Sequence, residues 1–393
     1  LYDSERGDAS TNHSYKWLVP NENYEENSGS ANLYQLHSLT STGFKVQYTN
    51  TLNESGRKFA SWSFAKQEGF FDVVKFSTTG GGGTQAISHS LGSIPGFIII
   101  KKTSAAQSWF TFHKSVTSPN SNWWRNWSDL TTAAFDDYFS DDSAINSAPT
   151  ATAVTLGSYF TDQTADFIMY VFAEGGSDDQ IFGDDGDESI IKTGSFSHTS
   201  GTPTFVNCGF EAAWVIAKRY DSTDSWWMAD DMRGFTPNGI SSNTPYLAAN
   251  TNAAEGASDW IGPNAQGFDF NYLTGDYVYI AIRRGPMKEP SAGTDVYNYQ
   301  TRGGGGSGPP AYIFPHPVDW FFQRELGQSD DWYSGSRMIG PHVIKPDETD
   351  ALASQTFLGA FDYQNGFGAG TGTASAQIAY AWRRYPKVFD IVF

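Results

Sequence analysis

One pattern of hydrophobic and polar positions occurs four times along the chain. Each copy has a small or polar lead-in, a run in which aromatic and aliphatic side chains alternate, and a short charged or polar end. The copies are residues 56–66 (GRKFASWSFAK), 164–175 (TADFIMYVFAEG), 275–285 (GDYVYIAIRRG) and 376–386 (AQIAYAWRRYP). Alternation with a period of two predicts β-strands. In the third copy both sets of alternating positions are apolar, which predicts a strand in the centre of its sheet.

The four copies also define a repeat. Aligned on Lys66, Glu174, Arg284 and Arg384, they are spaced by 108, 110 and 100 residues, which is the size of a small domain. A second pattern consists of an aromatic residue that opens an apolar run, one or two basic residues, and then a Trp. Its aromatic-to-Trp spacing is 12 residues in all three copies: Phe97–Trp109, Trp214–Trp226 and Trp320–Trp332. This spacing predicts a hairpin whose second strand begins at the Trp.

Two shorter phrases follow the same period. DSERG (3–7), DDMRG (230–234) and SGSRMIG (334–340) place Arg6, Arg233 and Arg337 at corresponding points, and Gly-Phe steps occur at 43–44, 267–268 and 366–367. We therefore divide the chain into the C-terminal part of unit one (1–67), unit two (68–177), unit three (178–287), a divergent unit four (288–386), and a first strand of a following repeat (387–393). On this division the chain is expected to be a slice of a longer array.

The composition indicates an all-β protein. Aromatic residues make up 16% of the chain, and it has 40 Gly, a composition typical of strands separated by many turns. The expected fold is a series of tandem β-sandwich, jelly-roll-like domains of about 100 residues each. In unit two we expect strands at 70–76, 85–89, 96–102, 108–114, 152–160 and 165–173, and a short helix at 129–140. The four-glycine runs at 78–85 and 301–308 are expected to be flexible hairpin tips.

Charge and cysteine content exclude several classes of function. The chain has 25 Lys+Arg against 43 Asp+Glu, a formal charge of −18, which disfavours nucleic acid as a partner. Cys208 is the only cysteine, so no disulfide can form within the chain, and its apolar neighbours predict a buried thiol. The sequence has no apolar run of the length needed to insert into a membrane.

Two segments are candidate ligand sites. Aromatic and polar side chains that could stack on and hydrogen-bond to a host glycan are Trp123, Trp124, Arg125, Asn126 and Trp127, with Trp227 as a further exposed candidate; packing against the domain or a neighbouring subunit is the alternative. Oxygen ligands suited to Ca²⁺ come from Asp184, Asp185, Asp187 and Glu188; an acidic linker is the alternative. No cofactor is otherwise expected.

The sequence predicts no catalytic residues. The carboxylates clustered at 136–142 and the pair Asp230–Asp231 could act as acid and base, but they do not recur in all units, and solvated loop charge is the favoured interpretation. His89, before a Leu-Gly turn, is interpreted as a hydrogen-bonding turn residue. We therefore expect a protein that is not an enzyme.

Together, these phrases resemble a repeat in virion proteins of marine tailed phages, especially those that infect cyanobacteria. The resemblance rests on ISHSLGSIPGFIIIKK (87–102), SWFTFH (108–113), DSERG (3–7), SDLTTAA (128–134), GF (267–268) and FIMYVFAEG (167–175). It implies a structural tail-fibre, head-fibre or appendage subunit on the exposed surface of the virion. Its expected partners are other virion subunits, further copies of itself, including a homotrimer, and host glycans. A bacterial adhesin or extracellular filament and a polysaccharide depolymerase are the alternatives.

Overall fold

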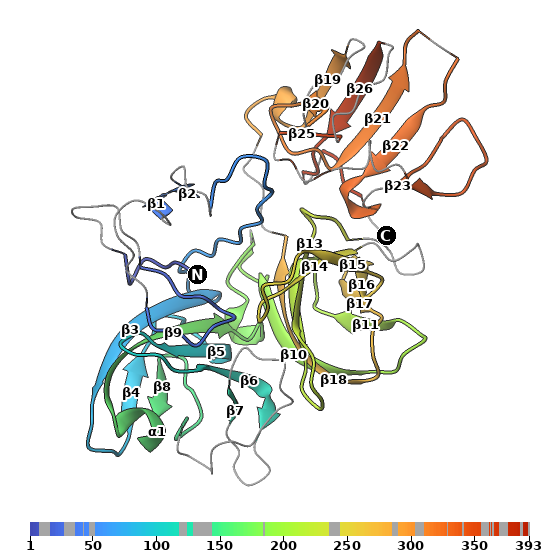
Figure 1. Ribbon diagram of the computed structural model, residues 1–393. Helices are drawn as coiled ribbons and strands as arrows, with labels where there is room; N and C mark the ends of the chain where they lie inside the picture. The colour runs from blue at the N-terminus through green and yellow to red at the C-terminus, as the bar shows by residue number, and fades with distance from the viewer. Residues whose placement is uncertain are drawn as a thin grey trace.

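The computed structural model describes residues 1–7, 16–26, 36–41, 43–46, 52–117, 124–128, 144–183, 185–235, 244–284, 290–302, 310–327, 329–339, 342–354, 361, 363, 365–368, 376–385 and 388–391. In these ranges the chain is all-β apart from α1 (Ser158–Thr161) and the short 3-10 turns η1 (Ser177–Asp179), η2 (Gly293–Asp295) and η3 (Arg337–Ile339). Its antiparallel sheets form several β domains (Figure 1). The predicted all-β class is therefore confirmed.

Unit two contains a five-stranded sheet and a two-stranded sheet. The larger sheet has the order β3 (Phe71–Thr79), β9 (Thr164–Ala173), β5 (Pro95–Lys102), β6 (Trp109–Thr117) and β7 (Trp124–Ser128). The smaller sheet pairs β4 (Gln85–Ser88) with β8 (Ala153–Leu156). Strands are found at all six expected places, although the predicted strand at 152–160 ends early and continues as α1. The helix predicted at 129–140 lies outside the described residues.

Units three and four repeat this arrangement of a larger and a smaller sheet. In unit three the larger sheet has the order β10 (Ile191–His198), β18 (Gly275–Arg283), β12 (Ala212–Arg219), β13 (Trp226–Asp230), β14 (Thr244–Ala248) and β15 (Gly256–Ser258). The smaller sheet contains β11 (Thr204–Asn207), β17 (Gly267–Phe270) and β16 (Ile261–Asn264).

In unit four the larger sheet has the order β19 (Tyr297–Arg302), β26 (Gln377–Trp382), β21 (Trp320–Glu325) and β22 (Tyr333–Ser336). The remaining pairs are β20 (Tyr312–Ile313) with β25 (Gly366–Phe367), and β23 (His342–Val343) with β24 (Ala353–Ser354). In the N-terminal part, β1 (Leu36–Thr40) pairs with β2 (Gly43–Val46).

Residues 56–66 form no β-strand, contrary to the sequence-based prediction, and instead contact units two and three through Trp62 and Phe64. In units two, three and four the closing strand is central, as the two apolar faces of the third copy predicted. β9, β18 and β26 each lie between the opening strand of the unit and the first strand of its hairpin. The three hairpins share one register: Phe97 pairs with His113, Trp214 with Asp230 and Trp320 with Ser336, always 16 residues apart. The predicted hairpins are therefore confirmed, except that β22 begins one residue after Trp332.

A buried lysine next to the Trp explains the conserved spacing of the first two hairpins. Lys101 and Lys218 pair directly with Trp109 and Trp226 across the strands, and all four side chains are buried. The Lys218 ammonium donates a hydrogen bond of 2.8 Å to the carbonyl oxygen of Asp224 in the turn, and that of Lys101 donates to the corresponding carbonyl oxygen of Gln107. The lysine thus satisfies a turn carbonyl while its methylene chain covers the Trp.

The Gly-Phe step has a steric cause in units three and four. Phe268 and Phe367 are fully buried and pair with Val206 and Tyr312. A Cβ atom on Gly366 would lie 1.9 Å from the carbonyl oxygen of Tyr312, and one on Gly267 would lie 1.8 Å from that of Val206. Only glycine therefore allows this strand pairing. Phe44, by contrast, is exposed on β2.

The four-glycine run of unit two is not a hairpin tip, contrary to the sequence-based expectation. Residues 80–83 connect β3 of the five-stranded sheet to β4 of the two-stranded sheet, and these two strands do not pair. All four glycines have positive φ angles between 74° and 96°. The Thr161 hydroxyl donates a hydrogen bond of 2.8 Å to the carbonyl oxygen of Gly83, so the run is a crossover held against α1. The corresponding run in unit four lies outside the described residues.

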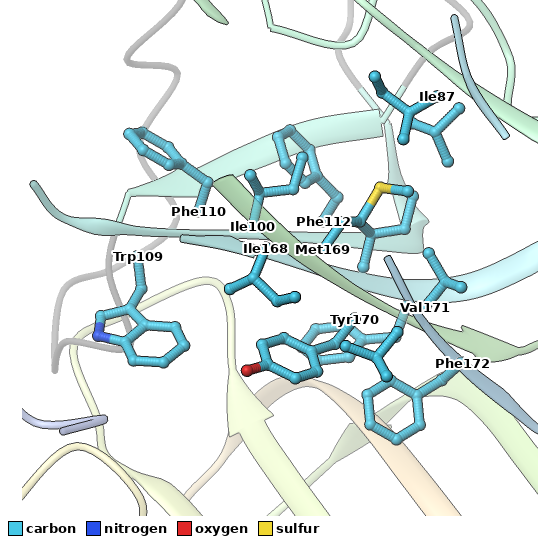
Figure 2. Packing of buried hydrophobic residues seen from close by; sticks show 14 of the residues in the cluster. Ile87, Ile100, Trp109, Phe110, Phe112, Ile168, Met169, Tyr170, Val171 and Phe172 are labelled. Atoms are coloured by element: carbon cyan, nitrogen blue, oxygen red, sulfur yellow. The ribbon is translucent and has the colours of Figure 1, made fainter. Parts of the chain in front are cut away.

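The five-stranded sheet of unit two is buried on both faces. Figure 2 shows Ile100 and Phe110 on one side of this sheet and Trp109 and Tyr170 on the other. The first side packs with Ile87, Val154 and Leu156 of the smaller sheet in the same unit, whereas the second packs with residues of unit three and with Leu18. One hydrophobic core therefore extends across the boundary between units two and three, and the smaller cores of units three and four are separate from it.

Candidate functional site at the unit junctions

The N-terminal segment is attached to unit two by a buried ion pair. Asp3 accepts hydrogen bonds from the backbone N–H of Arg6 at 2.9 Å and from Arg6 Nε at 2.6 Å. Tyr170 of β9 donates its hydroxyl proton to Asp3 at 2.6 Å and accepts a hydrogen bond from Arg6 at 3.2 Å. Burial raises the pKa of the Tyr170 hydroxyl well above its ordinary value, so it remains a donor. The phrase DSERG is thus a hook that holds this segment on the central strand.

The same hook occurs in unit three. Asp230 accepts from the backbone N–H of Arg233 at 2.9 Å and from its Nε at 2.7 Å, as Asp3 does from Arg6. Trp62, from the segment before unit two, donates its indole N–H to Asp230 at 3.2 Å. The Arg233 guanidinium lies 5.5 Å from the centre of the Trp62 ring. Asp230 is therefore a buried junction residue, and the prediction that it carries solvated loop charge is wrong.

The junction between units two and three combines rings with polar contacts. The Phe97 and Trp226 ring centres are 5.8 Å apart, and Phe64 contacts both Phe172 and Trp214. His113 of β6 is fully buried, and its Nε2 lies 3.2 Å from the carbonyl oxygen of Tyr279 in β18. Because a carbonyl only accepts, Nε2 carries the proton. Burial lowers the pKa of His113 to about 3.

The junction between units three and four is a network of charges. Arg284 donates to Asp319 at 2.8 Å, and its Nε lies 3.8 Å from Asp231. Arg384 binds both carboxylate oxygens of Glu211, at 2.8 and 2.6 Å. Burial raises the pKa of Asp231 to about 6, and Arg284 partly opposes this shift. Asp231 is therefore a second junction residue that the sequence wrongly indicated as loop charge.

Arg337 links these two units through backbone oxygens. It is buried, and its guanidinium donates to Met232 of unit three at 3.0 Å and to Val318 of its own unit at 2.9 Å. In the shared hairpin register, Arg337 follows the residue paired with Trp320, as Asp231 follows the one paired with Trp214. Its structural equivalent is therefore Asp231, two places from the Arg233 with which the sequence phrases aligned it.

Equivalent positions at the two junctions carry opposite charges. Lys114 has the register position of Asp231, and Glu174 has that of Arg284. Lys114 forms an ion pair with Glu174, and Arg284 lies 3.8 Å from Asp231. In unit four both positions are Arg, and Asp319 contacts both: it lies 3.5 Å from Arg337 and accepts from the backbone N–H of Arg384 at 2.7 Å. Units two and three therefore keep an attractive pair with the charges reversed, whereas in unit four the two arginines are joined through Asp319.

The predicted glycan residues are only partly described. Trp123 lies outside the described residues. Trp124, Arg125, Asn126 and Trp127 lie on β7, at the edge of the unit two sheet, and only their backbone is described. Trp227 is half-buried rather than exposed: its indole N–H donates to Asp224 at 2.9 Å, and its ring contacts Tyr246 at 4.5 Å. The structure thus places Trp227 in unit three, on a sheet other than that of β7.

The predicted calcium residues are spread over a short loop. Asp184 lies outside the described residues, and Asp185 and Asp187 are exposed. Glu188 pairs with Arg283 at 2.6 Å. Within the part of the chain that the structure describes, no group of three or more His, Cys, Asp or Glu side chains is placed to hold a metal ion.

Two interpretations of single residues are confirmed. Cys208 is buried, and burial raises the pKa of its thiol to about 12. His89 accepts a hydrogen bond of 3.3 Å at Nδ1 from the backbone N–H of Leu91 in the turn. Sequence reasoning missed the junction roles of His113, Asp319 and Arg384. Only Arg384 had a signal, namely its place at the end of the repeated closing phrase.

Comparison with known proteins gives a family without an assigned function. The family model described as Domain of unknown function (DUF7483) matches residues 1–282. No curated protein and no solved structure matches the chain. Among the described residues, no helix has the length and apolar character required to span a membrane. The match covers most of the 393 residues, and the chain therefore belongs to the DUF7483 family.

Proposed function

We propose that this chain is a structural subunit of a tailed-phage particle, in which jelly-roll-like β-sandwich units are joined into an exposed appendage. The observation that carries the proposal is the nature of the junctions. Units two and three share one hydrophobic core, and units three and four are joined by buried or half-buried charges that bond across the boundary. Domains connected in this way hold a fixed relative orientation, as a part that transmits mechanical force requires.

The carboxylates at the unit junctions are paired with arginines, which supports a structural role. Asp230 bonds to Arg233, Glu211 to Arg384 and Asp319 to Arg284. Each of these carboxylates is therefore held in an ion pair within or between the units, as expected of residues that stabilise the fold. The virion assignment itself rests on the sequence phrases that resemble phage virion proteins. A bacterial adhesin or filament and a polysaccharide depolymerase remain the alternatives.

Immunogold imaging of purified particles tests the virion assignment. An antibody raised against residues 68–287 is expected to label fibres or other projections, with pre-immune serum as the control. Label that is absent from particles and present on host cells or secreted filaments would contradict the assignment and support the adhesin. Cleavage of host polysaccharides by the purified chain would support the depolymerase instead.

The predicted contact with host glycans is tested separately. If residues 123–127 bind a host polysaccharide, Trp127→Ala is expected to weaken binding measured by affinity electrophoresis. Phe205→Ala is the matched control, because Phe205 is an aromatic residue that is 49% exposed on another unit. Equal retardation of wild type and Trp127→Ala would exclude a role for Trp127.

A further inference from the structure

Unit four has an aromatic grid on the outer face of its larger sheet. The strand register places six aromatic residues in two rows across three strands: Tyr297, Trp382 and Trp320 in one, and Tyr299, Tyr380 and Phe322 in the other. Neighbouring rings touch, with centres 4.4 Å apart for Trp320 and Trp382 and 5.1 Å apart for Tyr297 and Trp382. Tyr299 is 61% exposed and Tyr297 is 38% exposed, and Phe389 covers one corner by contacting Trp320.

The aromatic grid is not needed for the core of unit four. The alternate residues of the same strands, Phe321, Ala379 and Ala381, are fully buried against Tyr312 and Phe367 on the other face of the sheet. A sheet with one buried face normally has polar residues on its solvent face. Six aromatic residues on that face therefore indicate a partner.

Units two and three show what covers this face. The register equivalents of the aromatic grid in unit two are Phe71, Phe172, Phe97, Val73, Tyr170 and Ile99. Those in unit three are Ile191, Ile282, Trp214, Thr193, Ile280 and Ile216. All of these except Thr193 belong to, or pack against, the one core that extends across the junction of the two units. Within this chain, the equivalent faces of two units thus bury each other.

We propose that two copies of this chain pair through their aromatic grids, so that unit four of one copy covers unit four of the other. A face that packs against its own equivalent gives a closed two-fold contact. The chain carries a charge of −18, which opposes association elsewhere, whereas the six grid positions carry no charge. This inference identifies a partner and a surface, and it does not depend on the virion assignment.

The pairing is expected to be weak. The rows are about 6.8 Å apart and the strands about 4.8 Å apart, and the rings already cover one another in part. The surface area that each copy would bury through its grid is therefore below the ~800 Å² per partner of a standard stable interface. Dimers are expected to form as the concentration rises and to persist at high salt, because salt screens the repulsion between acidic chains.

Sedimentation velocity of the whole chain over a concentration series tests the proposal. Wild type is expected to shift from monomer to dimer, and Tyr299→Lys is expected to remain monomeric. Phe205→Lys is the matched control, which adds the same charge at an exposed aromatic residue outside the grid and should dimerise like wild type. Circular dichroism checks that the variants are folded, as the exposure of both side chains predicts.

Three results would overturn the proposal. Wild type could be monomeric at every concentration up to its solubility limit, Tyr299→Lys could dimerise as wild type does, or the assembly could be a trimer. If the chain stays monomeric and a soluble polysaccharide quenches tryptophan fluorescence in wild type but not in Tyr299→Lys, the grid is a glycan site instead. Because this experiment uses the purified chain alone, its failure leaves the virion assignment unaffected.

Discussion

His113 is expected to make the protein less stable in mild acid, because it is buried as a neutral ring between units two and three. Its pKa is lowered to about 3 from the ordinary 6.5, first by burial and then by the neighbouring Lys114. The unfolded chain therefore binds a proton at a higher pH than the folded chain does. The sign follows: stability falls as the pH drops from 6.5 towards 3, and no further loss from this group occurs below 3.

The size of the effect follows from the two pKa values. At pH 5 the unfolded ring is mostly protonated and the folded ring is not, so this one residue costs about 2 kcal/mol relative to pH 7.5. His113→Gln keeps an N–H donor for the carbonyl oxygen of Tyr279 but cannot titrate. The drop in unfolding free energy between pH 7.5 and pH 5 should therefore be about 2 kcal/mol smaller in this variant than in wild type.

Urea unfolding at the two pH values, followed by tryptophan fluorescence, measures this difference. Other histidines whose pKa is lowered by burial, such as His89 and His198, contribute equally to wild type and variant, so they cancel in the comparison. Phe205→Gln, at an exposed position of another unit, removes no titrating group and is the control, which should retain the wild-type pH dependence. If His113→Gln lost as much stability in acid as wild type, the folded state would not be keeping the His113 ring unprotonated, and the reasoning would be refuted.

Three further perturbations test the steric and ionic contacts. Gly366→Ala should cost more than ~2 kcal/mol in urea unfolding, because the Cβ would meet the carbonyl oxygen of Tyr312; Gly293→Ala, where the space is open, is the neutral control, and equal midpoints would contradict the steric argument. In wild type, Asp231 should add about 2 kcal/mol to the unfolding free energy as the pH falls from 7.5 to 4.5, since a carboxyl whose folded pKa is raised to about 6 binds its proton first in the folded state. Asp231→Asn should abolish this gain in stability, and an unchanged pH profile would show that Asp231 is not desolvated. Arg233→Lys should speed tryptic cleavage within residues 56–66, because a lysine cannot both bond to Asp230 as Arg233 does and lie over the Trp62 ring. Cleavage at the wild-type rate would mean that the Asp230–Arg233 hook does not hold this segment.

The local parts of the fold could be predicted from the sequence because they depend on neighbours in the chain. The hairpin of Phe97 and Trp109 and its counterpart in unit three follow from an apolar run, a polar turn and a Trp at fixed spacing. In the closing strand both sets of alternating positions are apolar. This can be seen in the linear sequence, and it is sufficient to place the strand inside a sheet. The strand positions of unit two were therefore recoverable, whereas the sequence phrases aligned Arg6 with Arg233 without showing that each bonds to the Asp three residues before it.

What covers each face could not be predicted in the same way. Alternation in β9 shows that Tyr170 and Phe172 are on an apolar face, but it does not show that unit three supplies the other side. Junction charges are equally hidden, because Arg384 and its partner Glu211 are 173 residues apart. Asp230 and Asp231 were assigned to solvent since adjacent acidic residues usually lie in loops, and only the fold shows the arginines beside them.

The charge reversal between equivalent positions argues that the order of the units is encoded at their junctions. Lys114 with Glu174 in unit two becomes Asp231 with Arg284 in unit three, so both junctions keep an attractive pair at the same place. In unit four two arginines occupy these positions, and Asp319 stands where the register has Gly96 in unit two and Ala213 in unit three. A half-buried like-charge contact is costly. With unit two in the place of unit three, Glu174 would take the position of Arg284 beside Asp319 and set two carboxylates against each other, so unit four has a preferred neighbour although the units share one strand plan.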